Sequence, residues 1–360
     1  MHLLDNPTVY RRLDPNNTVG SVKSLGLQCR QAWEGMRSVK LPPSYRNAQR
    51  ICIIGMGGSA LGGNMLRAIY GQSLAIPLDV VNSYVLPAYV DEQTLLILSS
   101  YSGTTGEVLA CRADALRRRA KVFVITNGGA LGKWAKAKRL PAFIFDDSAG
   151  NPSDQPRMGL GYSVFGQLAL LVKLGLLRVS ERDVRDIEAL LTRCNKRWGV
   201  AVPFRHNPAK QLAAKVQNKI VQLVASEHLA GNVHVWANQT NETAKTLSDY
   251  RIIPELNHHL LEGLPFPKQN RQLVYFVLFT SLLYDPRNRL RHTITQQVLR
   301  GNHIGFSRAQ LTAATRLGQA MEMLLLGSYV TLYQALLGNV NPSKIPWVDF
   351  FKAALKKRTR

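Results

Sequence analysis

The sequence predicts an α/β protein with two domains, each built on a doubly wound parallel sheet. The chain has 360 residues, whereas single hydrophobic cores rarely grow beyond about 250 residues. Apolar strand-like runs alternate with helix-like runs between residues 51 and 147, which is typical of a parallel sheet. Loops rich in glycine and hydroxyl groups follow two of these runs, at the sheet edge where such folds bind ligands.

The first half keeps this alternation in order. We expect a helical lead-in over 1–48 and a first domain over 49–179. The strands are expected at 51–55, 77–84, 94–100, 121–127 and 142–147, and the helices at 59–71, 105–119, 130–138 and 158–177.

The second half is less regular, and we expect a second α/β domain with C-terminal helices over 180–360. Residues 180–199 predict an amphipathic connecting helix with Ser180 as its N-cap. Residues 308–338 predict a long helix. Strand-like runs occur at 233–238, 251–256, 272–279 and 303–307.

The charge is strongly positive: 46 Lys and Arg residues against 23 Asp and Glu residues give +23. This balance favours anionic ligands, nucleic acid or acidic surfaces. The basic residues are spread along the chain and form no basic arm. A solvated basic surface is therefore the favoured interpretation, and no nucleic-acid partner is expected.

The four cysteines form no CxxC pair, which argues against a zinc or redox motif and favours a reduced, cytoplasmic protein. No metal site is expected. The run 273–284 is shorter than the ~20 residues that a transmembrane helix needs, so no membrane segment is expected. The N-terminus shows no apolar signal region.

The first glycine-rich loop fits two kinds of ligand. Gly55, Gly57 and Ala60 match the G-x-G-x-x-G/A fingerprint between a strand and a helix, which would hold the pyrophosphate of a nicotinamide cofactor. That fingerprint requires an acidic residue at the end of the next strand, where this chain has Asn82. A smaller anion is therefore favoured, with a simple tight turn as the alternative.

The second loop, SYSGTT, follows the strand at 94–100. It places Ser100, Ser102, Thr104 and Thr105 around Gly103, immediately before a helix. Hydroxyls, a glycine and free helix N–H groups suit a phosphate monoester. Ordinary turn and cap chemistry is the alternative, but two such loops on consecutive strands are more specific.

Together these motifs resemble a known family. GMGGSA and SYSGTT look like the sugar isomerase (SIS) domain. QPRMGLGYSVF (155–165), NETAK (241–245), PELNHH (254–259) and the C-terminal 327–357 are similar to the bifunctional phosphoglucose/phosphomannose isomerase family. The resemblance implies two flavodoxin-like SIS domains and a homodimer. It also implies aldose–ketose isomerisation of hexose 6-phosphates through a cis-enediol, without metal or organic cofactor.

The resemblance also implies catalytic roles. Glu242 matches the base that moves the proton between C1 and C2, and Arg157 matches the cation that faces the enediolate. His258 matches the histidine that opens the sugar ring, contributed by the partner subunit, although His259 beside it is an alternative. Lys352 matches a C-terminal lysine near the ring oxygen.

Further positions match the substrate-binding residues. Ser343 stands where the family often has threonine and is a candidate for substrate preference, which the departures at 233–240 and 259–264 also leave open. The phosphate ligands implied by the match are Gly57, Gly58, Ser59, Ser100, Ser102 and Thr105.

A second class of SIS protein is an alternative interpretation of the sequence. A non-catalytic SIS protein that senses a sugar phosphate would carry the same phosphate loops. Such regulators usually have a helix-turn-helix or a catalytic partner domain, and residues 1–48 are short for either. The joint presence of Glu242, Arg157 and His258 favours an enzyme.

Overall fold

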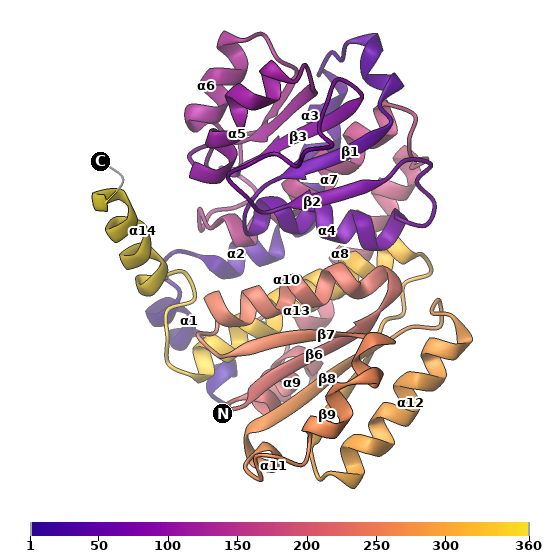
Figure 1. Cartoon of the computed structure of the whole chain (residues 1–360). Helices are drawn as coiled ribbons and strands as arrows, with labels where there is room; N and C mark the ends of the chain where they lie inside the picture. Colours follow the sequence, from indigo (N-terminus) through magenta and orange to yellow (C-terminus); the bar gives the residue numbers. More distant parts are fainter. Residues whose placement is uncertain (1, 359–360) are drawn as a thin grey trace.

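The computed structural model describes residues 2–358 and contains two parallel sheets, one in each half of the chain. Figure 1 shows the sheets one above the other, with a layer of helices between them. The predicted fold class is confirmed: both domains are α/β units with parallel strands.

The first sheet has the strand order β2-β1-β3-β4-β5, so the order reverses between β1 and β3. Ile54 of β1 pairs with Leu98 of β3, so the loops that follow these strands leave the sheet side by side. The strands are β1 (Arg50–Ile54), β2 (Leu78–Val81), β3 (Thr94–Ser99), β4 (Lys121–Thr126) and β5 (Ala142–Ile144).

Helices cover both faces of this sheet because successive side chains in a strand point to opposite sides. Ile53 packs toward α3, α4 and α7, whereas Ile54 packs toward α5 and α6. The helices of the first half are α1 (Pro7–Leu13), α2 (Thr18–Lys23), α3 (Leu25–Arg37), α4 (Gly58–Tyr70), α5 (Gly106–Arg117), α6 (Gly129–Ala137) and α7 (Leu160–Lys173).

The second sheet has the order β7-β6-β8-β9. Helices α9, α10 and α13 pack on one face, and α12 lies on the other. The strands are β6 (Ile220–Ser226), β7 (Ser248–Ile253), β8 (Val274–Thr280) and β9 (Gly305–Gln310). The helices are α8 (Glu181–Trp198), α9 (Pro208–Val216), α10 (Ala230–Glu242), α11 (Asn270–Leu273), α12 (Pro286–Gly301), α13 (Arg316–Leu337) and α14 (Pro346–Arg358).

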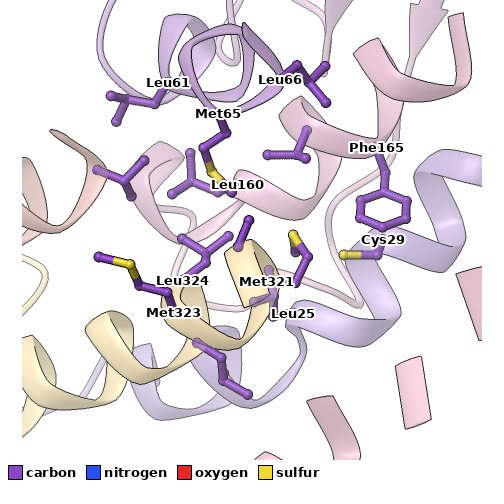
Figure 2. Close-up of a cluster of buried hydrophobic side chains, with 14 of the residues drawn as sticks. Leu25, Cys29, Leu61, Met65, Leu66, Leu160, Phe165, Met321, Met323 and Leu324 are labelled. Atoms are coloured by element: carbon purple, nitrogen blue, oxygen red, sulfur yellow. The ribbon is translucent and has the colours of Figure 1, made fainter. Parts of the chain in front are cut away.

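One continuous core joins the two domains. Figure 2 shows Met65 of α4 and Leu160 of α7 beside Leu324 of α13, with Cys29 of α3 close by. Helix α13 is long and apolar enough to cross a membrane by length and composition, but 94% of its most apolar window is buried inside the protein. It is the one helix that meets these criteria between residues 2 and 358.

Two secondary-structure predictions in the second half were wrong. Residues 233–238 alternate like a strand but lie within α10, and residues 308–310 belong to β9 because α13 starts only at Arg316. Most of α10 is buried, so apolar and polar residues do not segregate onto two faces. In such a helix periodicity cannot distinguish a helix from a strand.

Candidate active site

The two predicted phosphate loops lie together at the C-terminal edge of the first sheet. Gly57 takes φ +48°, a left-handed conformation that glycine adopts without strain. The Oγ of Ser59 accepts the N–H of Tyr101 at 2.8 Å, which ties the first loop to the second. The two loops together form the candidate phosphate cradle, in which Ser59 is buried and Gly57 is exposed.

The hydroxyls of the second loop are paired with one another. The Oγ of Ser100 lies 2.7 Å from Thr105 Oγ1, and the Oγ of Ser102 lies 2.8 Å from Thr104 Oγ1. Ser102 and Thr104 are exposed, whereas Ser100 is buried. The loop therefore presents hydroxyl groups at the N-terminus of α5, where free N–H groups favour an anion.

Ser102→Ala is expected to raise KM for a sugar phosphate about 10-fold with little change in kcat. A hydrogen bond to a charged group contributes roughly 1.5–3 kcal/mol. Steady-state kinetics check this, with Ser73→Ala as the control because that hydroxyl bonds only the nearby Tyr70 carbonyl among its described contacts. An unchanged KM would argue that Ser102 does not contact the phosphate.

The Arg157 side chain lies between the domains, in the short 3₁₀ helix η3 (Pro156–Met158). Next to it, a Cβ on Gly58 would come within 3.0 Å of the Pro156 carbonyl oxygen, so η3 packs directly on the first phosphate loop. Arg157 is buried, with only 6% of its side chain exposed. It therefore lies in the interior, in the short helix that packs on the first loop.

All five N–H donors of the Arg157 guanidinium have acceptors. Nε donates to Thr243 Oγ1 at 3.2 Å, and Nη2 donates to the carbonyls of Pro342 at 2.7 Å and Ser343 at 2.8 Å. Nη1 donates to the Gln155 side chain at 2.9 Å and to Glu242 at 3.4 Å. Burial lowers the pKa of Arg157, and the nearby Glu242 carboxylate partly offsets this. An arginine remains protonated all the same.

Glu242 is the last residue of α10, and its Oε2 faces Arg157 across the 3.4 Å contact. Its side chain is 36% exposed, so the carboxylate has a buried cation on one side and solvent on the other. The carboxylate is therefore open to solvent and lies beside a fixed positive charge. The structure thus brings together the sequence-predicted pair Arg157 and Glu242.

Lys245 was not singled out from the sequence, although it lies inside the NETAK motif. Its Nζ donates to the carbonyls of Thr243 at 3.1 Å and Asn341 at 2.6 Å, which joins the two segments that surround Arg157. Partial desolvation and the neighbouring Arg157 charge lower the pKa of Lys245 to about 8, against the opposing effect of Glu242.

Activity is expected to fall as the pH rises through about 8, because Lys245 is protonated below its pKa and loses its charge above it. The ammonium then no longer holds the segments beside Glu242 or attracts an anionic substrate. In kcat/KM profiles, Lys245→Met should lack this inflection, and Lys245→Arg should move it to higher pH. Identical wild-type and Lys245→Met profiles would contradict the assignment.

His258 does not lie near this pair in the same chain. It ends the 3₁₀ helix η6 (Glu255–His258), beyond the C-terminal end of β7, whereas Asn241, beside Glu242, bonds Ser248 at the start of β7. Strand β7 has six residues. The five steps from its first to its last residue separate the two positions by roughly 17 Å at ~3.3 Å per residue. Across residues 2–358, no hydrogen bond or ion pair joins His258 to Glu242.

The two adjacent histidines differ in their surroundings. Both are exposed, but the Nε2 of His259 lies 3.7 Å from the Glu255 carboxylate of its own chain. His258 has no such ion pair in the described part of the chain. Both imidazoles are therefore open to another molecule, and His258 is the one without a carboxylate contact among the described ion pairs.

The two C-terminal candidates differ in their relation to Arg157. The carbonyl of Ser343 accepts from the guanidinium, but its hydroxyl lies 2.8 Å from Thr18 Oγ1 and so points away from Glu242. Lys352 is exposed on α14, one turn after Asp349, whose charge acts on Arg157. Neither side chain contacts the Arg157–Glu242 pair directly in the described residues.

The alternative ligands find less support in the geometry. Where a dinucleotide site requires an acid, Asn82 donates from Nδ2 to the Gly55 carbonyl at 2.6 Å and so closes the first loop. Among residues 2–358, no group of three or more His, Cys, Asp or Glu side chains is placed to hold a metal ion.

Fold and site together define a protein of two SIS domains, in which η3 of the first domain packs on the first candidate phosphate loop and brings Arg157 to the Glu242 carboxylate of the second domain. Residues 205–355 match the family model of the bacterial phospho-glucose isomerase C-terminal SIS domain. A bifunctional phosphoglucose/phosphomannose isomerase of Caldicellulosiruptor bescii is 32% identical over 339 residues, covering 93% of this chain and 98% of that protein. The chain belongs to the bifunctional phosphoglucose/phosphomannose isomerase family.

A further relative supports the family, and a solved structure supports the fold. The protein of the same name from Thermoplasma volcanium is 28% identical and covers 84% of this chain and 90% of its own length. Among solved structures, a hypothetical protein from Thermus thermophilus superposes with a TM-score of 0.75 at 18% identity, covering 98% of this chain and 94% of that one. At that identity the structural match supports the fold alone.

Proposed function

We propose that the protein interconverts glucose 6-phosphate, and also mannose 6-phosphate, with fructose 6-phosphate. The observation that supports this best is the Arg157–Glu242 contact beside the hydroxyl-lined cradle. A base next to a buried cation suits proton transfer beside a carbonyl, because the cation stabilises the negative oxygen that forms.

In the proposed mechanism the loops around Ser59 and Ser102 hold the phosphate. The imidazole of His258 from a second copy, assisted by Lys352, transfers a proton and opens the ring. Glu242 removes the C2 proton, which leaves a cis-enediolate, and the Arg157 Nη1 faces its oxygen. Glu242 then returns the proton at C1 while the O2 hydroxyl proton passes to O1, which gives the ketose. Rotation about the C2–C3 bond would let Glu242 serve either aldose.

The direct test measures fructose 6-phosphate formation from each aldose phosphate by the purified protein, with EDTA present. Turnover of glucose 6-phosphate is expected. Binding of the sugar phosphate without turnover would support a non-catalytic sensor instead. Loss of activity caused by EDTA alone would argue against the metal-independent reaction.

We further propose a homodimer, active in the cytoplasm, in which each copy supplies His258 to the other. The roughly 17 Å length of β7, which keeps His258 from Glu242 within one chain, supports this arrangement. All four cysteines are free and buried, as suits a reducing compartment.

Mixing Glu242→Gln with His258→Ala is expected to restore activity that neither variant has alone. In a two-fold symmetric dimer, a mixed pair has one intact site out of two, so random exchange should restore about a quarter of wild-type activity. Mixing followed by a coupled assay measures this. His259→Ala in place of His258→Ala is the control and should keep its activity; failure of complementation would contradict a shared histidine.

A further inference from the structure

Helix α14 carries an apolar face that its own chain does not cover. None of its described side chains is buried, and Trp347, Phe350 and Phe351 are 81%, 66% and 63% exposed. Spacings of three and four residues place them on one face of the helix. Figure 1 shows α14 standing apart from both sheets. An exposed apolar face of this kind marks an interaction surface.

The start of α14 lies beside the proposed active site. The helix follows shortly after Ser343, whose carbonyl accepts from Arg157. The charge of Asp349, in its first turn, acts on the same guanidinium. A molecule that covers the first turn of α14 therefore also lies near Arg157.

A cavity lies against η6, the 3₁₀ helix that ends at His258. It has a volume of about 910 Å³ and lies between η6 and α12. Leu290 and Ile294 of α12 are 59% and 46% exposed. Residues that line this η6–α12 groove include Pro254, Asn257, Leu261, Leu290, Arg291 and Ile294.

The groove also carries charges that suit α14. Its lining contains both signs: Arg287, Arg291 and Arg316 are basic, and Glu227 and Asp285 are acidic. Arg287 already pairs with Asp285 in the same chain. An α14 laid with its first turn over α12 would bring Asp349 of that turn toward Arg291.

We propose that α14 of one copy packs its face of Trp347, Phe350 and Phe351 into the η6–α12 groove of a second copy. The inference rests on the proposed function, in which His258 of one copy reaches Glu242 of the other. That contact brings the groove beside His258 close to the N-terminal end of the other copy's α14. Two-fold symmetry repeats the packing, so each copy gives one helix and receives one.

Two single substitutions test the contact from its two sides. Phe351→Asp on α14 and Ile294→Asp in the groove are each expected to raise the dissociation constant of the dimer by at least ~30-fold, as for a central interface residue. Sedimentation velocity over a concentration series measures this. Val85→Asp is the matched control, because Val85 is 67% exposed at a distant loop of the first domain.

Disulfide trapping gives a second readout that does not depend on weakened association. The four native cysteines are buried, so Phe351→Cys combined with Leu290→Cys should yield a covalent dimer on mild oxidation. Neither single variant should do so. Dimers that persist in both aspartate variants, with no covalent dimer in the double cysteine variant, would overturn the inference.

These readouts separate the inference from the proposed function. A dimer that depends on α14 but does not isomerise hexose phosphates would refute the function and leave the docking in place. An active dimer with shared His258 that does not depend on α14 would refute the docking alone. A monomeric, active wild type would refute both the docking and the shared histidine.

Discussion

Glu242→Gln is expected to lower kcat for glucose 6-phosphate isomerisation about 10³-fold, within the ~10²–10⁴ range of general acid–base catalysis. Glutamine keeps the size of the side chain and can still accept from the Arg157 Nη1, which now lies 3.4 Å from the Glu242 carboxylate. It cannot take up the C2 proton. KM should change little, because the phosphate loops are untouched.

Deuterium at C2 of the substrate provides the matching measurement for this variant. In wild type, Glu242 exchanges the transferred proton with solvent at its exposed side, so deuterium is partly washed out. Full activity in Glu242→Gln would refute the assignment of the base. Glu92→Gln is the control, since that glutamate is exposed in the first domain and lies outside both the candidate site and the η6–α12 groove.

Arg157→Lys is expected to lower kcat by about 10²–10³-fold, the usual effect of removing a donor that stabilises an oxyanion. Lysine keeps the charge but has three donors, whereas the guanidinium uses all five of its own. The contacts to Thr243, Pro342 and Ser343 cannot all be kept. The segment 341–343 should then also become less ordered.

Stability must be measured alongside activity for this variant. Removing a buried, hydrogen-bonded charge can destabilise the fold, so a thermal melt of Arg157→Lys accompanies the kinetics. Arg205→Lys, in an exposed part of the second domain, is the control for exchange of the residue type. A kcat within twofold of wild type, with a normal melt, would remove Arg157 from the proposed chemistry.

The sequence predicted the first sheet well because its strands are short apolar runs, and β1 and β3 are followed directly by Gly55 and Ser100. Strand β6 was missed because Gln222 interrupts its apolar run and Glu227, not glycine, follows it. Glu227 still adopts φ +46°. A glycine at position 227 would have indicated a turn after a strand. A glutamate gives no such indication, although its backbone makes the same turn.

The candidate site was predictable only in part. Arg157 and Glu242 were identified by motif, but their mutual contact depends on the packing of η3 against α10. Two of the Arg157 acceptors are the backbone carbonyls of Pro342 and Ser343. A carbonyl is present in every residue, so no sequence pattern could indicate which ones face the guanidinium.

The placement of Glu242 and His258 at opposite ends of β7 has a kinetic consequence. Under the proposed mechanism, proton transfer needs one chain, whereas ring opening needs two. Dilution below the dimer dissociation constant should therefore abolish turnover of the closed pyranose first. A substrate that cannot cyclise should still be isomerised by the separated chains, so the two halves of the reaction would differ in their dependence on enzyme concentration.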